Sequence, residues 1–373
     1  MKHTAMQAAI AGVFAFAAAS GAALEDGNGL LGRRAAWMQG RCGIMVHWLY
    51  PSYKDVDRWT DAFDVPAFLE DFEATGADWL VFTAGQCKGA YASPNATFER
   101  LCGDGHLPKR DLLLEIAKGV KALGKRFIVY SAVDFVKDGC DDHSMQKGLC
   151  WDESKPDRRE FEKRWSSVLR EWSLRLGDLC DGWWLDGCAR YNYRAGVDWR
   201  TWLDACRAGN PRSAVAFNGG VNEPAEPWGP SDYFAGEISC LDAIEDVAGL
   251  MLPCENSVRH YLFPIDGYWG AYWPWPVSDW AKAANLRKVR PDLFDKEKMA
   301  ALESAGEFPD PAYSAARLCA FAKTAAATDA GVTLNIGISP KGRLNPKSVE
   351  LAAAVSRILA VPAVSRAAIR SEM

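Results

Sequence analysis

The sequence has few histidines and no paired metal-binding motif. Its five histidines stand at positions 3, 47, 106, 143 and 260 of 373 residues, and no two of its eleven cysteines form a Cys-x-x-Cys pair. Zinc sites in proteins need clustered ligands of this kind. A glycine-rich loop that would cradle the phosphates of a nucleotide follows none of the predicted strands. We therefore expect neither a metal nor a cofactor.

Positive charge is also scarce. The chain carries 43 Lys and Arg against 48 Asp and Glu, which gives a net charge of −5, and its isoelectric point is near 5.7. Nucleic acids and anionic membrane surfaces attract proteins with basic patches or basic overall charge. The composition therefore predicts no nucleic-acid partner.

Long hydrophobic runs are missing beyond the N-terminus. Residues 1–22 have the pattern of a secretory signal, with Lys2 and His3 ahead of an apolar core at 8–19 and small residues at 20–22. This core is too short to span a bilayer, and no later stretch is long enough. We expect cleavage near Ala23, export to a periplasm or the outside, and no membrane insertion.

Cysteine is plentiful for an exported chain. Eleven cysteines predict some disulfides, and the odd number leaves at least one thiol unpaired. Two pairs are close along the chain and are candidates, namely Cys140 with Cys150 and Cys180 with Cys188.

Apolar strands alternate with amphipathic helices along the rest of the chain. Predicted strands occupy residues 43–48, 79–83, 126–131, 183–186, 214–218, 232–237 and 331–336, with another near Tyr268 and Trp269 in a Pro- and Trp-rich stretch. Predicted helices include 111–123, 158–176, 199–208, 312–327 and 348–359. Such repeated units favour a (β/α)8 TIM-like barrel, with a doubly wound open sheet as the alternative. No linker interrupts the pattern, so residues 23–373 are expected to form a single catalytic domain.

Carboxylates stand at the ends of two predicted strands. The stretch 182–187, Gly-Trp-Trp-Leu-Asp-Gly, is apolar until Asp186, and Glu237 ends the strand at 232–237. A charge there must face a cavity or a partner, and strand carboxyl ends form the ligand-binding side of a barrel. The alternatives are a turn or helix cap for Asp186 and an ion pair or cap for Glu237. Glu255 is a rival to Glu237, whereas the loop acids Asp134, Asp232 and Asp266 are interpreted as structural.

Two convergent carboxylates in a cleft with aromatic walls are the arrangement that glycoside hydrolysis needs. One attacks the anomeric carbon, and the other protonates the leaving oxygen. The sixteen tryptophans of the chain fit this interpretation, since flat indole faces suit the apolar faces of sugar rings, although most of them are expected to be core residues.

Several segments together resemble the α-L-fucosidase family of glycoside hydrolases. Residues 43–48, Gly-Ile-Met-Val-His-Trp, are similar to the family's first-strand Gly-Ile-Phe-Ile-His-Trp. Residues 184–187, Trp-Leu-Asp-Gly, are similar to its Trp-Phe-Asp-Gly. Segments 76–83, 108–111 and 334–342 follow the family pattern in the same order, so the resemblance covers most of residues 37–360.

The resemblance implies a (β/α)8-like barrel and exo-hydrolysis with retention. Asp186 matches the family's nucleophile, and Glu237 matches the acid/base of many bacterial members, with Glu255 as the alternative. His47 would hydrogen-bond a sugar hydroxyl, and Trp59 would match a sugar-contacting Trp. The expected substrate-binding set is His47, Trp48, Trp59, Gln86, Cys87, Tyr130 and Trp269.

The sequence also departs from this family. Gln86-Cys87 replaces a pair of histidines that grip fucose hydroxyls, Arg58 replaces a Glu, and the Arg expected after the fifth strand is absent from Asn218-Gly219-Gly220. A site that reads particular hydroxyls discriminates strongly. We therefore expect a divergent member, reduced to the catalytic barrel, whose sugar differs from fucose.

Two other functions remain open at this point. The lost histidine pair is compatible with a non-catalytic, carbohydrate-binding relative. A barrel enzyme with Cys87 as a thiol nucleophile on another substrate class is the third possibility.

Overall fold

The protein is built around a curled, fully parallel seven-stranded sheet. The computed structural model describes residues 33–48, 55–86, 91–135, 143–189, 192–221, 228–241, 256–266, 269 and 291–360. Within them the strand order is β5-β4-β3-β2-β1-β7-β6. The strands are β1 (Cys42–Val46), β2 (Trp79–Gly85), β3 (Arg126–Ala132), β4 (Gly182–Asp186), β5 (Ala214–Phe217), β6 (His260–Pro264) and β7 (Gly331–Asn335). The first and last strands are neighbours, as the barrel prediction requires, and the chain is of the α/β class.

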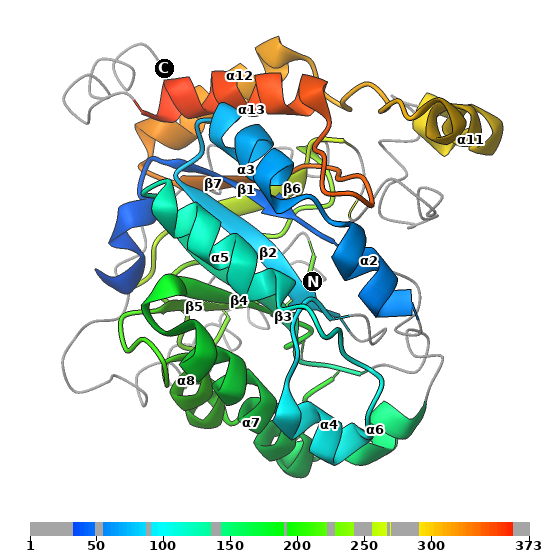
Figure 1. Cartoon of the computed structure of the whole chain (residues 1–373). Coiled ribbons are helices and arrows are strands. Elements are labelled where there is room, and N and C mark those ends of the chain that lie inside the picture. The colour runs from blue at the N-terminus through cyan, green and yellow to red at the C-terminus, as the bar shows by residue number, and fades with distance from the viewer. Residues whose placement is uncertain are drawn as a thin grey trace, which may run out of the picture.

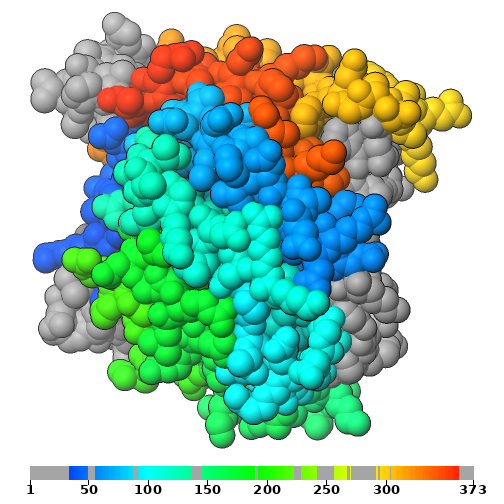
Figure 2. All heavy atoms as spheres, viewed as in Figure 1, coloured from blue at the N-terminus to red at the C-terminus, as the bar shows by residue number. Residues whose placement is uncertain are grey.

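Helices lie around the outside of this sheet, as Figure 1 shows. Figure 2 shows the same side as a surface of closely packed side chains. The α-helices are α2 (Val56–Ala62), α3 (Val65–Ala74), α4 (Ala96–Cys102), α5 (Leu112–Ala122), α6 (His143–Leu149), α7 (Arg159–Leu176), α8 (Trp199–Cys206), α11 (Lys296–Ala305), α12 (Ala315–Ala327) and α13 (Pro346–Leu359), and the 3-10 helices are η2 (Arg33–Met38), η5 (Gly177–Leu179) and η8 (Pro291–Phe294). None of the helices in the described ranges has the length and apolar character needed to cross a bilayer.

The two faces of the sheet bury two separate hydrophobic clusters. Because successive strand residues point to opposite faces, each strand contributes alternate side chains to each cluster. Trp183 and Leu185 of β4 face the helices, whereas Trp184 points to the inner side. The inner cluster includes Met45, Tyr130, Trp184, Ala216 and Ala235. This alternation decides which residues at the strand ends face inward.

Residues 232–238, which include the strand predicted at 232–237, contact both open edges of the sheet. The Asp232 N–H donates to Val215 O of β5 at 2.8 Å. Farther along, this segment pairs in parallel with the β6 side through bridges at Tyr233 and Glu237. Gly236 has a φ of +64°, and a Cβ there would lie 2.0 Å from His260 O, so only glycine permits this approach.

One prediction about this part of the molecule is wrong. The strand expected near Tyr268 and Trp269 lies at β6, His260–Pro264, where a polar residue at the start and Pro264 at the end shorten the apolar run. Trp269 follows the strand, and Tyr268 lies outside the described residues.

Neither of the two candidate disulfides forms, and the eight cysteines within the described ranges are all free. Cys180 and Cys188 are both free and lie at opposite ends of β4, too far apart for a bond between their sulfurs. Cys150 is free as well, so it is not joined to Cys140, which lies outside the described residues.

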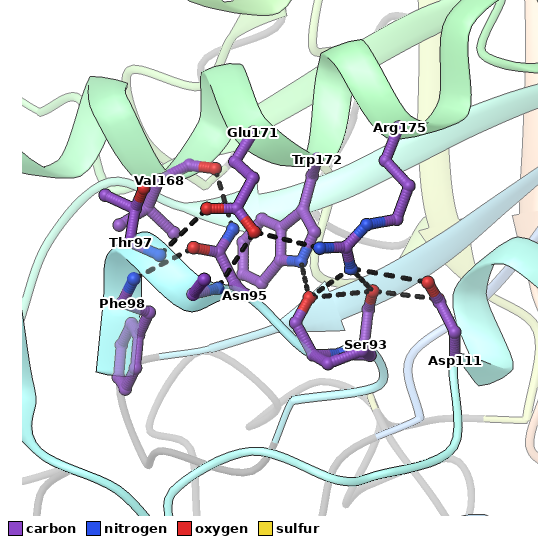
Figure 3. A network of polar contacts seen from close by, with 11 residues as sticks. Ser93, Asn95, Thr97, Phe98, Asp111, Val168, Glu171, Trp172 and Arg175 are labelled. Atoms are coloured by element: carbon purple, nitrogen blue, oxygen red, sulfur yellow. Dashed lines mark hydrogen bonds and ion pairs between the residues drawn. The ribbon is translucent and has the colours of Figure 1, made fainter. Parts of the chain in front are cut away.

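A polar network joins α4 to α7 (Figure 3). The Glu171 carboxylate of α7 accepts from the N–H groups of Ala96 and Thr97 in the first turn of α4, each at 2.8 Å. Arg175, one turn later, donates to Ser93 and pairs with Asp111 at 3.3 Å. The network fixes the chain between β2 and α5 against α7.

Candidate active site

Four polar side chains follow inward-facing core residues by two positions at the carboxyl ends of their strands. Asp186 follows Trp184, Asn218 follows Ala216, Glu237 follows Ala235, and His47 follows Met45; these four preceding residues all belong to the inner cluster. The period of two therefore turns all four side chains toward the inner side of the sheet. They come together above the inner cluster.

Asp186 is held by three donors. Its Oδ2 accepts from the Tyr130 hydroxyl at 2.6 Å, and its Oδ1 accepts from Asn218 Nδ2 at 2.8 Å and from the Gly187 N–H at 2.9 Å. The carboxylate remains partly exposed. An oriented carboxylate that is open on one side is suited to act as a nucleophile.

Glu237 lies beside Asp186 and shares a donor with it. Asn218 Nδ2 also donates to Glu237 Oε2, and the Glu237 side chain is 8% exposed. The structure thus brings together the two predicted catalytic carboxylates. Because both oxygens are within hydrogen-bond distance of one nitrogen, they are less than about 6 Å apart.

Tyr130 extends the chain of hydrogen bonds to Gln86. Gln86 Nε2 donates to the Tyr130 hydroxyl at 3.0 Å, and the Tyr130 ring stacks on Trp184 with centroids 5.2 Å apart. Burial, followed by the negative charge of Asp186, holds the pKa of Tyr130 well above its usual value. Tyr130 therefore stays protonated and donates to Asp186. Both predicted residues, Gln86 and Tyr130, lie at the site.

Asp134 adds a third carboxyl group, which the sequence interpretation had assigned a structural role. Asn192 Nδ2 donates to it at 3.1 Å and to Gly187 O at 2.9 Å. Gly187 has a φ of +81°, and a Cβ there would lie 2.5 Å from Asp134 Cγ, so glycine lets the carboxyl approach the end of β4. Burial and then the charge of Asp186 raise the pKa of Asp134 to about 7.

His47 lies at the edge of the carboxylate group. Its ring meets Tyr130 edge-on at 4.7 Å and Trp269 at 6.3 Å. It is 7% exposed, and burial lowers its pKa to about 3, so the imidazole is neutral. Neither ring nitrogen has a hydrogen-bond partner among the described residues. A neutral imidazole can donate one hydrogen bond and accept another.

Other predicted site residues lie elsewhere. Trp48 has the opposite orientation to His47, packs against Phe63 and Phe82 in the outer cluster and is fully buried, away from the carboxylate pair. Trp59 of α2 packs on the outer cluster, with the Arg58 guanidinium 5.1 Å above its ring. Cys87 and Glu255 lie outside the described residues.

Asn218, Asn192 and Asp134 were not predicted as site residues. Asn218 had a detectable signal, because it stands two positions after an inward-facing alanine just as Asp186 follows Trp184. The described residues contain no cluster of three or more His, Cys, Asp or Glu side chains that would hold a metal ion.

Comparisons with solved structures identify the architecture. The fold is similar to that of the endo-fucoidan hydrolase MfFcnA4 from glycoside hydrolase family 107, with a TM-score of 0.61 and 15% identity over 89% of this chain and 54% of that one. For the endo-fucoidan hydrolase P5AFcnA from the same family, the values are 0.62 and 15% over 88% and 93%. An α-L-fucosidase GH29 from Bacteroides thetaiotaomicron gives 0.53 and 13% over 87% and 72%. The chain has a fucosidase-like fold.

Comparison by sequence finds no relative of this chain. No model of a protein family matches the chain, and no curated protein does. The chain spans about half the length of MfFcnA4. At this level of identity the similarity establishes the fold, and the chemistry has to be argued from the residues.

Proposed function

We propose that the protein is a retaining glycoside hydrolase in which Asp186 is the nucleophile and Glu237 the general acid/base. The observation that carries this proposal is the pair of carboxylates that share Asn218 Nδ2 at the strand ends of a fucosidase-like fold. Retaining enzymes place their two carboxyl groups about 5–5.5 Å apart, and inverting enzymes about 6.5–9.5 Å. The upper limit of about 6 Å between the bridged oxygens favours retention.

The reaction then proceeds in two balanced steps. In the first, an Asp186 oxygen bonds to the anomeric carbon, the bond from that carbon to the leaving oxygen breaks, and the Glu237 proton passes to the leaving oxygen. In the second, Glu237 takes a proton from water, whose oxygen attacks the anomeric carbon and releases Asp186. His47 would accept or donate one hydrogen bond to a sugar hydroxyl, since its neutral imidazole can do either.

The substrate is proposed to be a glycan whose sugar differs from fucose. The neighbours of similar fold are named for fucoidan and for α-L-fucosides. In this chain the amide of Gln86, bonded to Tyr130, stands where the resemblance places a histidine. An amide and an imidazole present different donors and acceptors, so the preferred pattern of hydroxyls changes. Exo-hydrolysis remains the proposal for the mode of attack.

The barrel is proposed to close through residues 232–238. Two observations support it, namely the bond from Asp232 N–H to β5 and the parallel bridges from Tyr233 and Glu237 to the β6 side. With this segment as the eighth strand, the sheet would close into a (β/α)8 barrel with Glu237 at its mouth.

Kinetics with a panel of aryl glycosides, including fucosides, and with polymeric glycans including fucoidan test the function. Wild-type protein should release a monosaccharide with retained configuration. Asp186→Ala should lower kcat/KM by about 10³-fold or more. Glu237→Gln should lower it by about 10²–10⁴-fold for a poor leaving group and little for a strongly acidic phenol, which departs without a proton.

The outcomes separate the remaining alternatives. Oligosaccharide products would show endo-hydrolysis. If Glu255→Gln, rather than Glu237→Gln, shows the leaving-group dependence, the acid/base assignment to Glu237 fails. Glycan binding without turnover that survives Asp186→Asn would show a carbohydrate-binding protein without catalysis.

We also propose that the protein is exported and that residues from about Ala23 form the catalytic domain. The charged start, short apolar core and small residues of positions 1–22 support this proposal. Expression of the full chain in a secreting bacterial host should yield periplasmic or extracellular protein whose N-terminal sequence starts near Ala23. Retention of Met1 on protein from the cytoplasm would contradict it.

A further inference from the structure

Asn218 stands between the two carboxylates of the site, and its backbone is fixed by the chain on both sides of Asp186. The Asn218 N–H donates to Leu185 O at 2.7 Å, and Asn218 O accepts from the Cys188 N–H at 3.2 Å. The side chain is 4% exposed. Asn218 is therefore bound to the end of β4 as firmly as a neighbouring strand residue.

The orientation of the side-chain amide follows from its partners. The Asn218 Oδ1 accepts from the Gly220 N–H at 3.3 Å, and Nδ2 faces Asp186 Oδ1 and Glu237 Oε2. The opposite orientation would place an acceptor oxygen against two carboxylate oxygens. Each of the two hydrogens on Nδ2 thus serves one carboxylate.

A donor shared in this way suits a pair that exchanges charge during the reaction. When Asp186 bonds to the anomeric carbon it loses its negative charge, and when Glu237 gives up its proton it gains one. The Asn218 bond to Glu237 therefore strengthens as the bond to Asp186 weakens, because hydrogen bonds to ionised acceptors are the stronger ones. The same nitrogen also limits how far the two carboxylates can separate.

We propose that Asn218 is a positioning residue that sets the spacing of the carboxylate pair and carries a hydrogen bond from one carboxylate to the other as the charge moves. This role rests on the proposed function and adds a residue to it. Asn218 touches the two carboxylates, and it acts on the substrate only through them.

Kinetics of Asn218→Ala and Asn218→Asp test this role. Asn218→Ala should lower kcat by about 10- to 100-fold, the equivalent of one hydrogen bond to a charged group, with KM changed less than about threefold. Asn218→Asp has the same shape but, when ionised, offers no donor. Its activity should recover toward acid pH, where the new carboxyl is protonated and can donate, and Asn218→Ala should show no such recovery.

Asn210→Ala is the matched control. Asn210 is also a buried asparagine just before β5, and its Nδ2 donates to Cys180 O at 2.9 Å at the opposite end of β4. Its removal should lower stability as much as Asn218→Ala but leave kcat unchanged. A kcat of Asn218→Ala equal to that of Asn210→Ala would overturn the positioning role while leaving the proposed function intact.

Nuclear magnetic resonance tests the bridge without turnover. In protein labelled with ¹⁵N asparagine, the two side-chain amide protons of Asn218 can be assigned by their loss in Asn218→Ala. Asp186→Asn should move chiefly one of them and Glu237→Gln chiefly the other. If wild-type protein is inactive on all glycosides, the proposed function fails, but this experiment still tests whether Asn218 bonds to both carboxylates. Asn218 amide resonances that do not move in one of the two variants would overturn the shared hydrogen bond.

Discussion

Asp134 is a carboxyl group pressed against the end of β4, and its environment makes it sensitive to pH. Its neighbours are the charge of Asp186, the backbone of Gly187 and the amide of Asn192, and burial raises its pKa to about 7. In the unfolded chain its pKa would be near the ordinary value of about 4. Between these two values the folded state holds a proton that the unfolded state has lost.

We therefore expect stability to fall as the pH rises through this window. Below about pH 4 Asp134 is protonated in both states and does not lower the free energy of unfolding. Above about pH 7 it is ionised in both states, and the full cost of burying its charge is subtracted from the free energy of unfolding. Asp134→Asn keeps the shape and removes the charge, so it should be more stable than wild type at pH 8, with a gap that narrows toward pH 4.5. Urea unfolding at the two pH values measures this difference.

Asp204→Asn serves as the control because Asp204 is an exposed residue of α8 and the substitution changes the net charge equally. The difference in free energy of unfolding between Asp204→Asn and wild type should be about the same at pH 4.5 and at pH 8. Equal behaviour of the two variants would show that Asp134 titrates as an ordinary surface carboxyl.

Which site residues could be predicted depends on their chemistry. Asp186 and Glu237 are recognisable in sequence because a charge that ends an apolar strand requires a cavity or a partner. Asn218 occupies the same kind of position, two residues after the inward-facing Ala216, but it is neutral, so its position alone is a weaker signal than a charge at a strand end. Trp48 was predicted together with its neighbour His47, but adjacent strand residues face opposite sides, and Trp48 packs in the outer cluster.

At the scale of elements, α7 is held to α4 by the network of Figure 3. Glu171 lies at the N-terminus of α4, where its carboxylate satisfies two N–H groups that have no partner within the helix. Negative charge is also favourable there. Asn95 caps the same helix by accepting from the Phe98 N–H at 2.9 Å, so α4 has two caps.

Removal of the second cap should destabilise the protein modestly. Glu171→Ala should lower the free energy of unfolding by about 1 kcal/mol, since water can replace part of the lost bonding at this partly exposed site. Thermal or urea unfolding measures the change. Glu160→Ala is the control on the same helix, because it removes only the exposed pair with Arg164, and it should leave stability unaltered. Equal losses would mean that the α4 contact has no stabilising role.

The predictable elements are those with a long, regular pattern. The helices α5, α7 and α13 have apolar residues at helical spacing over three turns or more, and they were predicted within two residues of their observed ends. The short helices α2, α4 and α6 have seven residues each, too few for a clear period. Their stability depends on caps and packing that the sequence does not display.

At the scale of the whole molecule, the seven-stranded sheet has two edges, β5 and β6, and one segment contacts both. Asp232 lies at the start of this segment and is fully buried. Its Oδ2 accepts from the Val215 N–H at 2.8 Å and from Arg207 at 2.7 Å, and Arg34 lies 3.8 Å from its other oxygen. One carboxylate thus ties the segment to β5, to the helical layer and to the 3-10 helix η2.

Loss of this carboxylate should open the proposed closure before it unfolds the rest. Asp232→Ala removes the buried carboxylate that two largely buried arginines share, which should cost about 3–5 kcal/mol of the free energy of unfolding. Hydrogen exchange should then speed up at the amides of Ile238 and Val258, which bond across the segment, more than at the centre of the sheet. Because Glu237 lies on the same segment, the kcat of the proposed reaction should fall as well.

Asp266→Ala is the control. Asp266 is also a buried carboxylate, but it accepts hydrogen bonds from Gly337 and Ser348, so its loss should destabilise the protein without speeding up exchange at Ile238 and Val258. Uniform exchange in Asp232→Ala would mean that the segment is held in place by β6 alone, and the barrel would then be open between β5 and residue 232.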